Sequence, residues 1–166
     1  EPLATQAGKD IVWRARTGKA LPYLATLAAY PAVPIKERLR YFRAFDFTQS
    51  ASKSGLLLKM IRENKAGDAG LNKLVLHALD AGTVKRSALA QKALGQVLDS
   101  VRGTSEFIEL VAQYEVGNRQ KELMNMAISN PDESLGRDAA GLLLKLGGKQ
   151  AILRVINGKT GDTAAT

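Results

Sequence analysis

The feature that most restricts the fold is the recurrence of apolar residues at spacings of three and four, broken repeatedly by glycine or proline. This spacing places apolar side chains on one side of an α-helix, and each break ends one helix before the next begins. Aromatic residues make up only 5% of the chain, while leucine and alanine are abundant. Since sheets favour β-branched and aromatic residues, the sequence predicts an all-α protein of roughly ten short helices with short connections.

The predicted helices follow an irregular repeat. Helices open near Pro34, Ala69 and Thr104 at a spacing typical of two-helix repeats, and the next one opens slightly early at Pro131. We therefore expect a right-handed α-solenoid of about five helical hairpins, in which each repeat contacts its neighbours. Residues 1–158 are assigned to this single domain, and residues 159–166 to a polar tail that links it to a further domain.

One segment resembles a known repeat family. The run from Pro131 to Gly147, P-D-E-S-L-G-R-D-A-A-G-L-L-L-K-L-G, has a proline and acids at its start and a leucine-glycine pair at its end. It resembles the first helix of a HEAT repeat. The aliphatic, arginine, alanine and leucine positions of that motif fall on Leu135, Arg137, Ala140, Leu143 and Leu146. The resemblance implies a HEAT/ARM-like superhelix that serves as a binding scaffold, with Arg137 in a structural role.

Three other runs resemble a second group of proteins. They are R-L-R-Y-F-R-A-F-D-F, L-G-Q-V-L near Leu94 and L-L-L-K-L-G-G near Leu142. These runs are similar to helical segments of large exported bacterial proteins of the membrane-bound-dehydrogenase type, where such a segment adjoins a cytochrome c domain. The haem motif is absent here, because the chain has no cysteine. The resemblance implies a spacer or docking segment of a longer, exported (periplasmic or extracellular) protein, without a redox centre.

The stretch from Pro34 to Phe47 is predicted to form one helix with two faces. Its apolar face combines Ile35 and Leu39 with Phe42 and Phe45. We expect Phe42 and Phe45 to be structural core residues. Tyr41 lies off this face and is predicted to be at the surface.

Asp46 lies four positions after Phe42 and is predicted to be structural. That spacing places its carboxylate on the apolar side, where an unpaired charge would cost several kcal/mol. The expected partners are backbone N–H groups at residues 48–50, or the guanidinium of Arg14 or Arg16.

A basic stripe on the same helix is the candidate binding site. Lys36, Arg40 and Arg43 recur at helical spacing, in a chain with a formal net charge of +8. Lysines and arginines often face solvent without a partner, so the stripe by itself does not establish binding. We favour a protein partner or neighbouring domain. The alternative is a nucleic-acid-binding solenoid that uses the basic first half, with binding that weakens steeply with salt.

Residues typical of catalysis are scarce. The chain has no cysteine and a single histidine, His77, which lacks a second imidazole or thiolate to share a metal or a proton. Acidic pairs such as Asp132 and Glu133 are explained by helix starts. No apolar run approaches the roughly 18 residues of a membrane span. We therefore predict a non-enzymatic protein with no cofactor, no metal and no membrane span, monomeric as an isolated domain.

Overall fold

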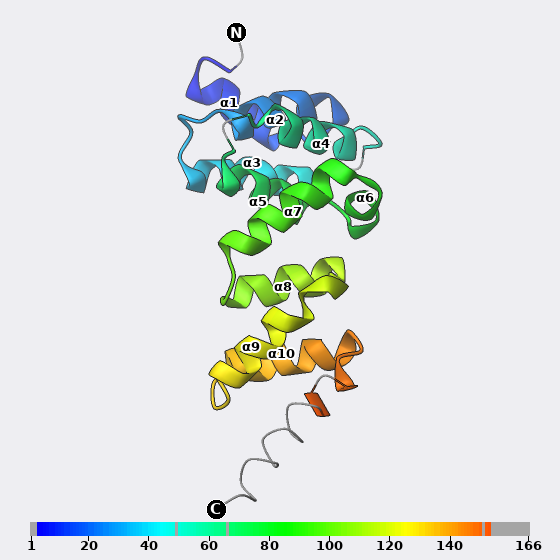
Figure 1. Ribbon diagram of the computed structural model, residues 1–166. Helices are drawn as coiled ribbons and strands as arrows, with labels where there is room; N and C mark the ends of the chain where they lie inside the picture. Colours follow the sequence, from blue (N-terminus) through cyan, green and yellow to red (C-terminus); the bar gives the residue numbers. More distant parts are fainter. Residues whose placement is uncertain (1–2, 49, 66, 151, 154–166) are drawn as a thin grey trace, which may run out of the picture. The chain divides into compact units, whose positions relative to one another are not determined.

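The computed structural model describes residues 3–48, 50–65, 67–150 and 152–153 (Figure 1). Within this described part there are ten α-helices, two 3-10 helices and no strand, which confirms the predicted all-α class. None of the helices that it contains is long and apolar enough to cross a membrane. By its internal contacts the chain divides into two compact units, Glu1–Ser100 and Val101–Thr166.

The first unit contains seven α-helices among its described residues. They are α1 (Gln6–Arg14), α2 (Leu21–Ala29), α3 (Ile35–Asp46), α4 (Lys53–Glu63), α5 (Ala69–Ala78), α6 (Ala81–Arg86) and α7 (Ala88–Ser100), with the 3-10 helix η1 (Gly18–Ala20) before α2. Figure 1 shows two layers, one formed by α2 and α4 and the other by α3 and α5. Helix α1 packs on α2 and α3, and α7 packs on both α4 and α5.

Side-chain caps start several of these helices. Thr5 accepts a hydrogen bond from the Gly8 amide (3.1 Å), Asp68 from the Leu71 amide (3.0 Å) and Asp80 from the Thr83 amide (2.8 Å). Although glycine commonly ends helices, Gly82 lies inside α6, which the Asp80 cap starts. Helix α4 begins at Lys53, and its N-cap residue, Ser52, makes no side-chain cap hydrogen bond.

The second unit is built around a helical hairpin. Its elements are α8 (Ser105–Tyr114), the 3-10 helix η2 (Gly117–Arg119), α9 (Gln120–Ser129) and α10 (Ser134–Lys145). Helix α10 packs along α9 and also contacts α8. The approach to α9 is close at Gly136, where a Cβ atom would overlap the backbone carbonyl of Asn130. Glycine at this position lets the two helices of the hairpin pack closely.

The start of α10 differs from the predicted start at Pro131. The helix begins at Ser134, and Pro131 lies in the preceding turn. The buried face consists of Gly136, Ala139, Leu142 and Leu143, so Leu143 is the one position of the HEAT-like pattern that is fully buried. Arg137 is exposed, and its Nη1 donates to the carbonyl oxygen of Asp132 at 3.0 Å, which braces the turn before α10.

The proposed domain boundary at residue 158 and the polar tail 159–166 lie outside the described residues. The same holds for Val155 and Ile156, whose apolar spacing with Ile152 and Leu153 predicts a last helix. Of that helix, the structure describes Ile152 and Leu153 as helical. The assignment of one domain up to residue 158 therefore stays a prediction.

Helix α3 is rotated relative to the predicted orientation. Phe42 and Phe45 are buried as predicted, with ring centroids 5.9 Å apart. The other two residues of the predicted apolar face are exposed, Ile35 by 51% and Leu39 by 40%. Tyr41, predicted at the surface, is buried, and this burial, together with the charge of Glu37, raises the pKa of its hydroxyl. Two of the four residues on the predicted apolar face therefore lie outside the buried face of α3.

The reason for the rotation is Arg38, which is only 6% exposed. Its guanidinium donates to three carbonyl oxygens of the segment before α3, from Tyr30 (3.3 Å), Pro31 (3.1 Å) and Val33 (3.0 Å), and pairs with Asp68 at 2.6 Å. A buried arginine is tolerated when its donors are satisfied in this way. The side of α3 that carries Arg38 and Tyr41 therefore faces inward, and the side that carries Ile35 and Leu39 faces out.

The prediction for Asp46 was wrong. Its side chain is 62% exposed and lies 3.7 Å from the Nζ of Lys53. The rotation of α3 explains the error, because it moves position 46 to the outside of the helix. An exposed ion pair of this kind contributes little to stability.

A cation–aromatic groove as the candidate functional site

The predicted basic residues fall into two classes. Lys36 and Arg43 are exposed on α3, while Arg40 is half-buried and held by contacts to α1. Because α1 packs against α3, it adds Trp13 and Arg14 to the same surface, and Arg16 follows just after α1. The structure thus brings together cations from positions far apart in the sequence.

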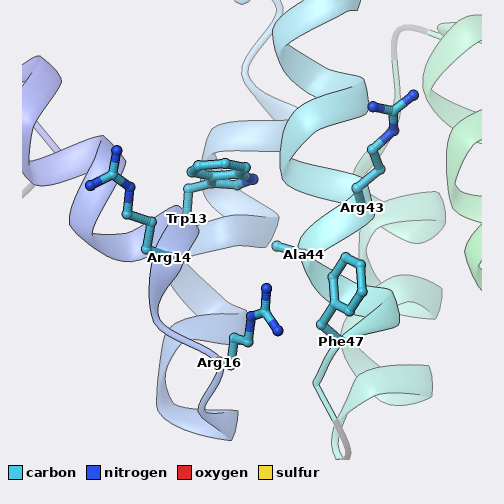
Figure 2. A pocket seen from close by; sticks show the side chains of 6 residues that line it. All are labelled: Trp13, Arg14, Arg16, Arg43, Ala44 and Phe47. Carbon is cyan, nitrogen blue, oxygen red and sulfur yellow. The ribbon is translucent and has the colours of Figure 1, made fainter.

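Two adjoining depressions define this surface. The larger, of about 380 Å³, is shown in Figure 2 and is lined by Trp13, Arg14, Arg16, Arg43, Ala44 and Phe47. The smaller, of about 270 Å³, is lined by Trp13, Lys36, Leu39, Arg40 and Arg43. They share Trp13 and Arg43. We call the two together the cation–aromatic groove.

Trp13 is fixed by Arg40. The indole Nε1 donates to the carbonyl oxygen of Arg40 at 3.0 Å, and the guanidinium of Arg40 lies 4.0 Å from the centroid of the indole ring. The same guanidinium donates to Asp10 Oδ1 at 2.7 Å. A cation over an aromatic face and a short ion pair both favour this arrangement. Arg40 therefore positions Trp13, and its charge is balanced by Asp10.

Phe47 forms the other aromatic wall. It is 61% exposed, and the guanidinium of Arg16 lies 4.8 Å from its ring centroid. In Figure 2 the head group of Arg16 turns toward Phe47, whereas those of Arg14 and Arg43 extend away from the ring. Arg16 was predicted as a partner of Asp46. Its observed partner is this ring.

The groove is strongly positive. Its described lining residues include five cations, of which Arg40 is paired with Asp10, and no acid. Neither Lys36 nor Arg43 forms an ion pair with any residue that the structure describes. Because nearby like charges add their potentials at short range, such a surface attracts anions and accelerates their encounter.

The side chains of the groove are suited to binding anions. Guanidinium groups donate hydrogen bonds in a planar fork that matches carboxylate and phosphate oxygens, and they do not lose a proton near neutral pH. His77 is exposed on α5, a helix that does not line the groove. Among the residues that the structure describes, no group of three His, Cys, Asp or Glu side chains could hold a metal ion.

Sequence reasoning found one half of this site. It identified Lys36, Arg40 and Arg43 but did not place Trp13, Arg14, Arg16 and Phe47 against them. The signal for the second half was the run W-R-A-R, an aromatic residue among cations that follows an acid, Asp10. Nothing local in the chain indicates that this run packs against α3.

Comparisons with known proteins give no match, so a function can be proposed from the geometry of the groove. No protein-family model matches this chain, and no curated protein or solved structure is significantly similar to it.

Proposed function

We propose that this protein is a non-catalytic helical scaffold that binds an acidic surface of a partner protein or neighbouring domain through the cation–aromatic groove. The observation that supports this proposal is the groove itself, in which cations surround exposed apolar and aromatic side chains. Arginine and aromatic residues are enriched at protein interfaces and account for much of their binding free energy.

The architecture that we propose for this scaffold is a HEAT/ARM-like right-handed solenoid. In the first unit, α2 contacts α4 and α3 contacts α5, so alternate helices pack on each other. Stacked helical hairpins have this pattern, and they offer long surfaces for a partner. The pattern supports the proposed architecture for the first unit.

A nucleic-acid partner is the second candidate. Phe47 is exposed and lies beside arginines. Proteins that bind single-stranded nucleic acid use such rings, because bases stack on them. Two observations favour a protein instead. Arg40 and Arg16 each lie over one face of an aromatic ring, and the neighbouring exposed side chains, Ile35 and Leu39, are aliphatic and offer no stacking surface.

The biological setting is also part of the proposal. The resemblance to helical segments of exported dehydrogenase-type proteins supports a partner surface on an adjacent domain of a redox protein. In that setting the chain is a spacer or docking segment. It holds no cofactor of its own.

A direct test measures binding of the full chain to two labelled anions of equal charge. One is an oligoglutamate peptide and the other is a thymidine oligonucleotide, both followed by fluorescence anisotropy at physiological ionic strength. Reversing two groove charges, Arg14→Glu with Arg43→Glu, should weaken oligoglutamate binding about tenfold, since interface charges of this kind each contribute up to about 1 kcal/mol.

The matched control reverses two exposed lysines of the second unit, Lys121→Glu with Lys145→Glu. This variant has the same net charge as the groove variant and should bind nearly as wild type. Equal loss in both variants would show that net charge alone attracts the peptide. Tight oligonucleotide binding that only the groove variant loses would establish the nucleic-acid alternative.

A further inference from the structure

The outer side of α3 combines apolar and cationic side chains, and of the two exposed aliphatic residues there Leu39 lines the groove. Ile35 and Leu39 are 51% and 40% exposed and lie one helical turn apart. Lys36 and Arg43 flank Leu39 on the same exposed side of the helix. Covering exposed aliphatic side chains with a partner lowers the free energy, because it removes apolar surface from water.

The spacing of these groups sets the pattern that a partner would match. Lys36 and Arg43 are seven positions apart, which corresponds to about 10 Å along the helix axis. Leu39 lies between them and lines the smaller depression together with Trp13. A complementary helix therefore needs an apolar side chain in the middle and an acid about one turn away on each side, so that the two acids are about two turns apart.

Trp13, which lines the smaller depression, is already fixed in place. Trp13 is held by its hydrogen bond to the Arg40 carbonyl and by the guanidinium over its ring, so its orientation is set before any partner arrives. A side chain that is already ordered loses less entropy on binding. Arg40 is engaged with Asp10, so Lys36 and Arg43 are the cations available to pair with acids here.

We propose that the occupant of the groove is an amphipathic acidic helix of the partner protein, with aliphatic anchors against Leu39 and Trp13 and carboxylates on Lys36 and Arg43. The inference rests on the proposed function and specifies its partner. Charge complementarity selects an acidic segment. The exposed aliphatic side chains select an amphipathic helix over a uniformly charged chain, in the mode by which amphipathic helices bind apolar grooves.

The experiment compares three labelled probes on the 166-residue chain at physiological ionic strength. The first is a peptide of leucine, alanine and glutamate that is amphipathic as a helix, and the second is a shuffled peptide of identical composition. The third is oligoglutamate. We expect the amphipathic peptide to bind at least tenfold more tightly than the shuffled peptide, because burial of one or two aliphatic side chains provides that factor.

Two single variants locate the contact. Leu39→Ser should weaken binding of the amphipathic peptide about tenfold and leave oligoglutamate binding unchanged. Leu144→Ser is the matched control, because Leu144 is a similarly exposed leucine on α10 of the second unit and is 52% exposed. This control should bind as wild type. Thermal melts of both variants check that folding is retained.

Each outcome separates the inference from the proposed function. Equal binding of the amphipathic and shuffled peptides, with loss in the Arg14→Glu/Arg43→Glu variant, would overturn the inference and keep the scaffold function. Binding of oligoglutamate without binding of the amphipathic peptide would also overturn the inference and keep the scaffold function. No binding of any acidic peptide, or preference for a thymidine oligonucleotide, would overturn both.

Discussion

Arg38 Nη1 lies 2.6 Å from Asp68 Oδ2, and this contact joins α3 to the N-cap residue of α5. The same guanidinium donates to carbonyl oxygens of residues 30, 31 and 33, and Asp68 also caps α5 through the Leu71 amide. One arginine thereby satisfies backbone groups of the segment before α3 and anchors the next helix of the same layer. The orientation of α3, and with it the position of the groove, depends on this contact.

Replacing Arg38 with methionine should strongly destabilise the first unit. Methionine has a similar reach but leaves three carbonyl oxygens and the Asp68 carboxylate without their donor, which costs about 3 kcal/mol or more. Urea denaturation followed by circular dichroism measures the free energy of unfolding. Arg62→Met, at an exposed position of α4, is the control and should change it by less than about 0.5 kcal/mol. Similar losses in the two variants would contradict a structural role for Arg38.

The stability of the protein should depend on pH through Asp68. The hydrogen bond from Arg38 lowers the pKa of its carboxyl below the ordinary 3.8, burial opposes this effect, and the Leu71 amide adds to it. A lowered pKa in the folded state means that the contribution is complete above the pKa of the unfolded chain and is lost as pH falls through the folded pKa.

We therefore expect the free energy of unfolding of the wild type to fall on acidification below about pH 4, and the Asp68→Asn variant to fall less steeply there. Urea denaturation at a series of pH values from neutral to acidic gives both slopes. At neutral pH the variant should already be less stable, since it lacks the ion pair. Superimposable slopes would mean that Asp68 does not couple folding to protonation.

Two glycines of α10 should respond in opposite directions to alanine. A Cβ at Gly136 would overlap the Asn130 carbonyl oxygen and lie 2.6 Å from its carbon, so Gly136→Ala must push α9 and α10 apart. We expect a loss of about 2–3 kcal/mol in line with overpacked sites. Gly141 has open space around it, and Gly141→Ala should stabilise the helix by up to about 1 kcal/mol. Thermal denaturation tests the pair, and a neutral Gly136→Ala would mean that the hairpin tolerates a wider separation.

Trp13 is the only tryptophan of the chain, so its fluorescence reports on the groove. Arg40→Ala removes the guanidinium that covers one face of the indole and leaves that face open to water. We expect the emission maximum to shift to longer wavelength. Arg62→Ala serves as the control, because Arg62 is exposed on α4 and does not line the groove. An unchanged spectrum in Arg40→Ala would show that the guanidinium does not shield the ring in solution.

Much of the helical content could be predicted from the sequence. Most helices lie where apolar spacing places them, because α-helix formation depends on groups three and four residues apart in the chain. The buried pair Phe42 and Phe45 was predicted for the same reason. Helix starts were less predictable. Asn130 and Pro131 have the composition of a helix start, yet α10 begins at Ser134.

The tertiary structure decided which side of each helix faces inward and which residues meet. Apolar spacing on α3 is compatible with two overlapping faces, and the carbonyl partners of Arg38 select the one that leaves Ile35 and Leu39 exposed. That choice moved Asp46 to the surface and Tyr41 to the interior. The groove follows from the packing of α1 on α3, which brings Trp13 to the backbone of Arg40 across 27 positions of the chain. Local apolar spacing was enough to determine the helices. The contact between Trp13 and Arg40 depends instead on the packing of many residues that are far apart in the sequence, so no short stretch of the sequence predicts it.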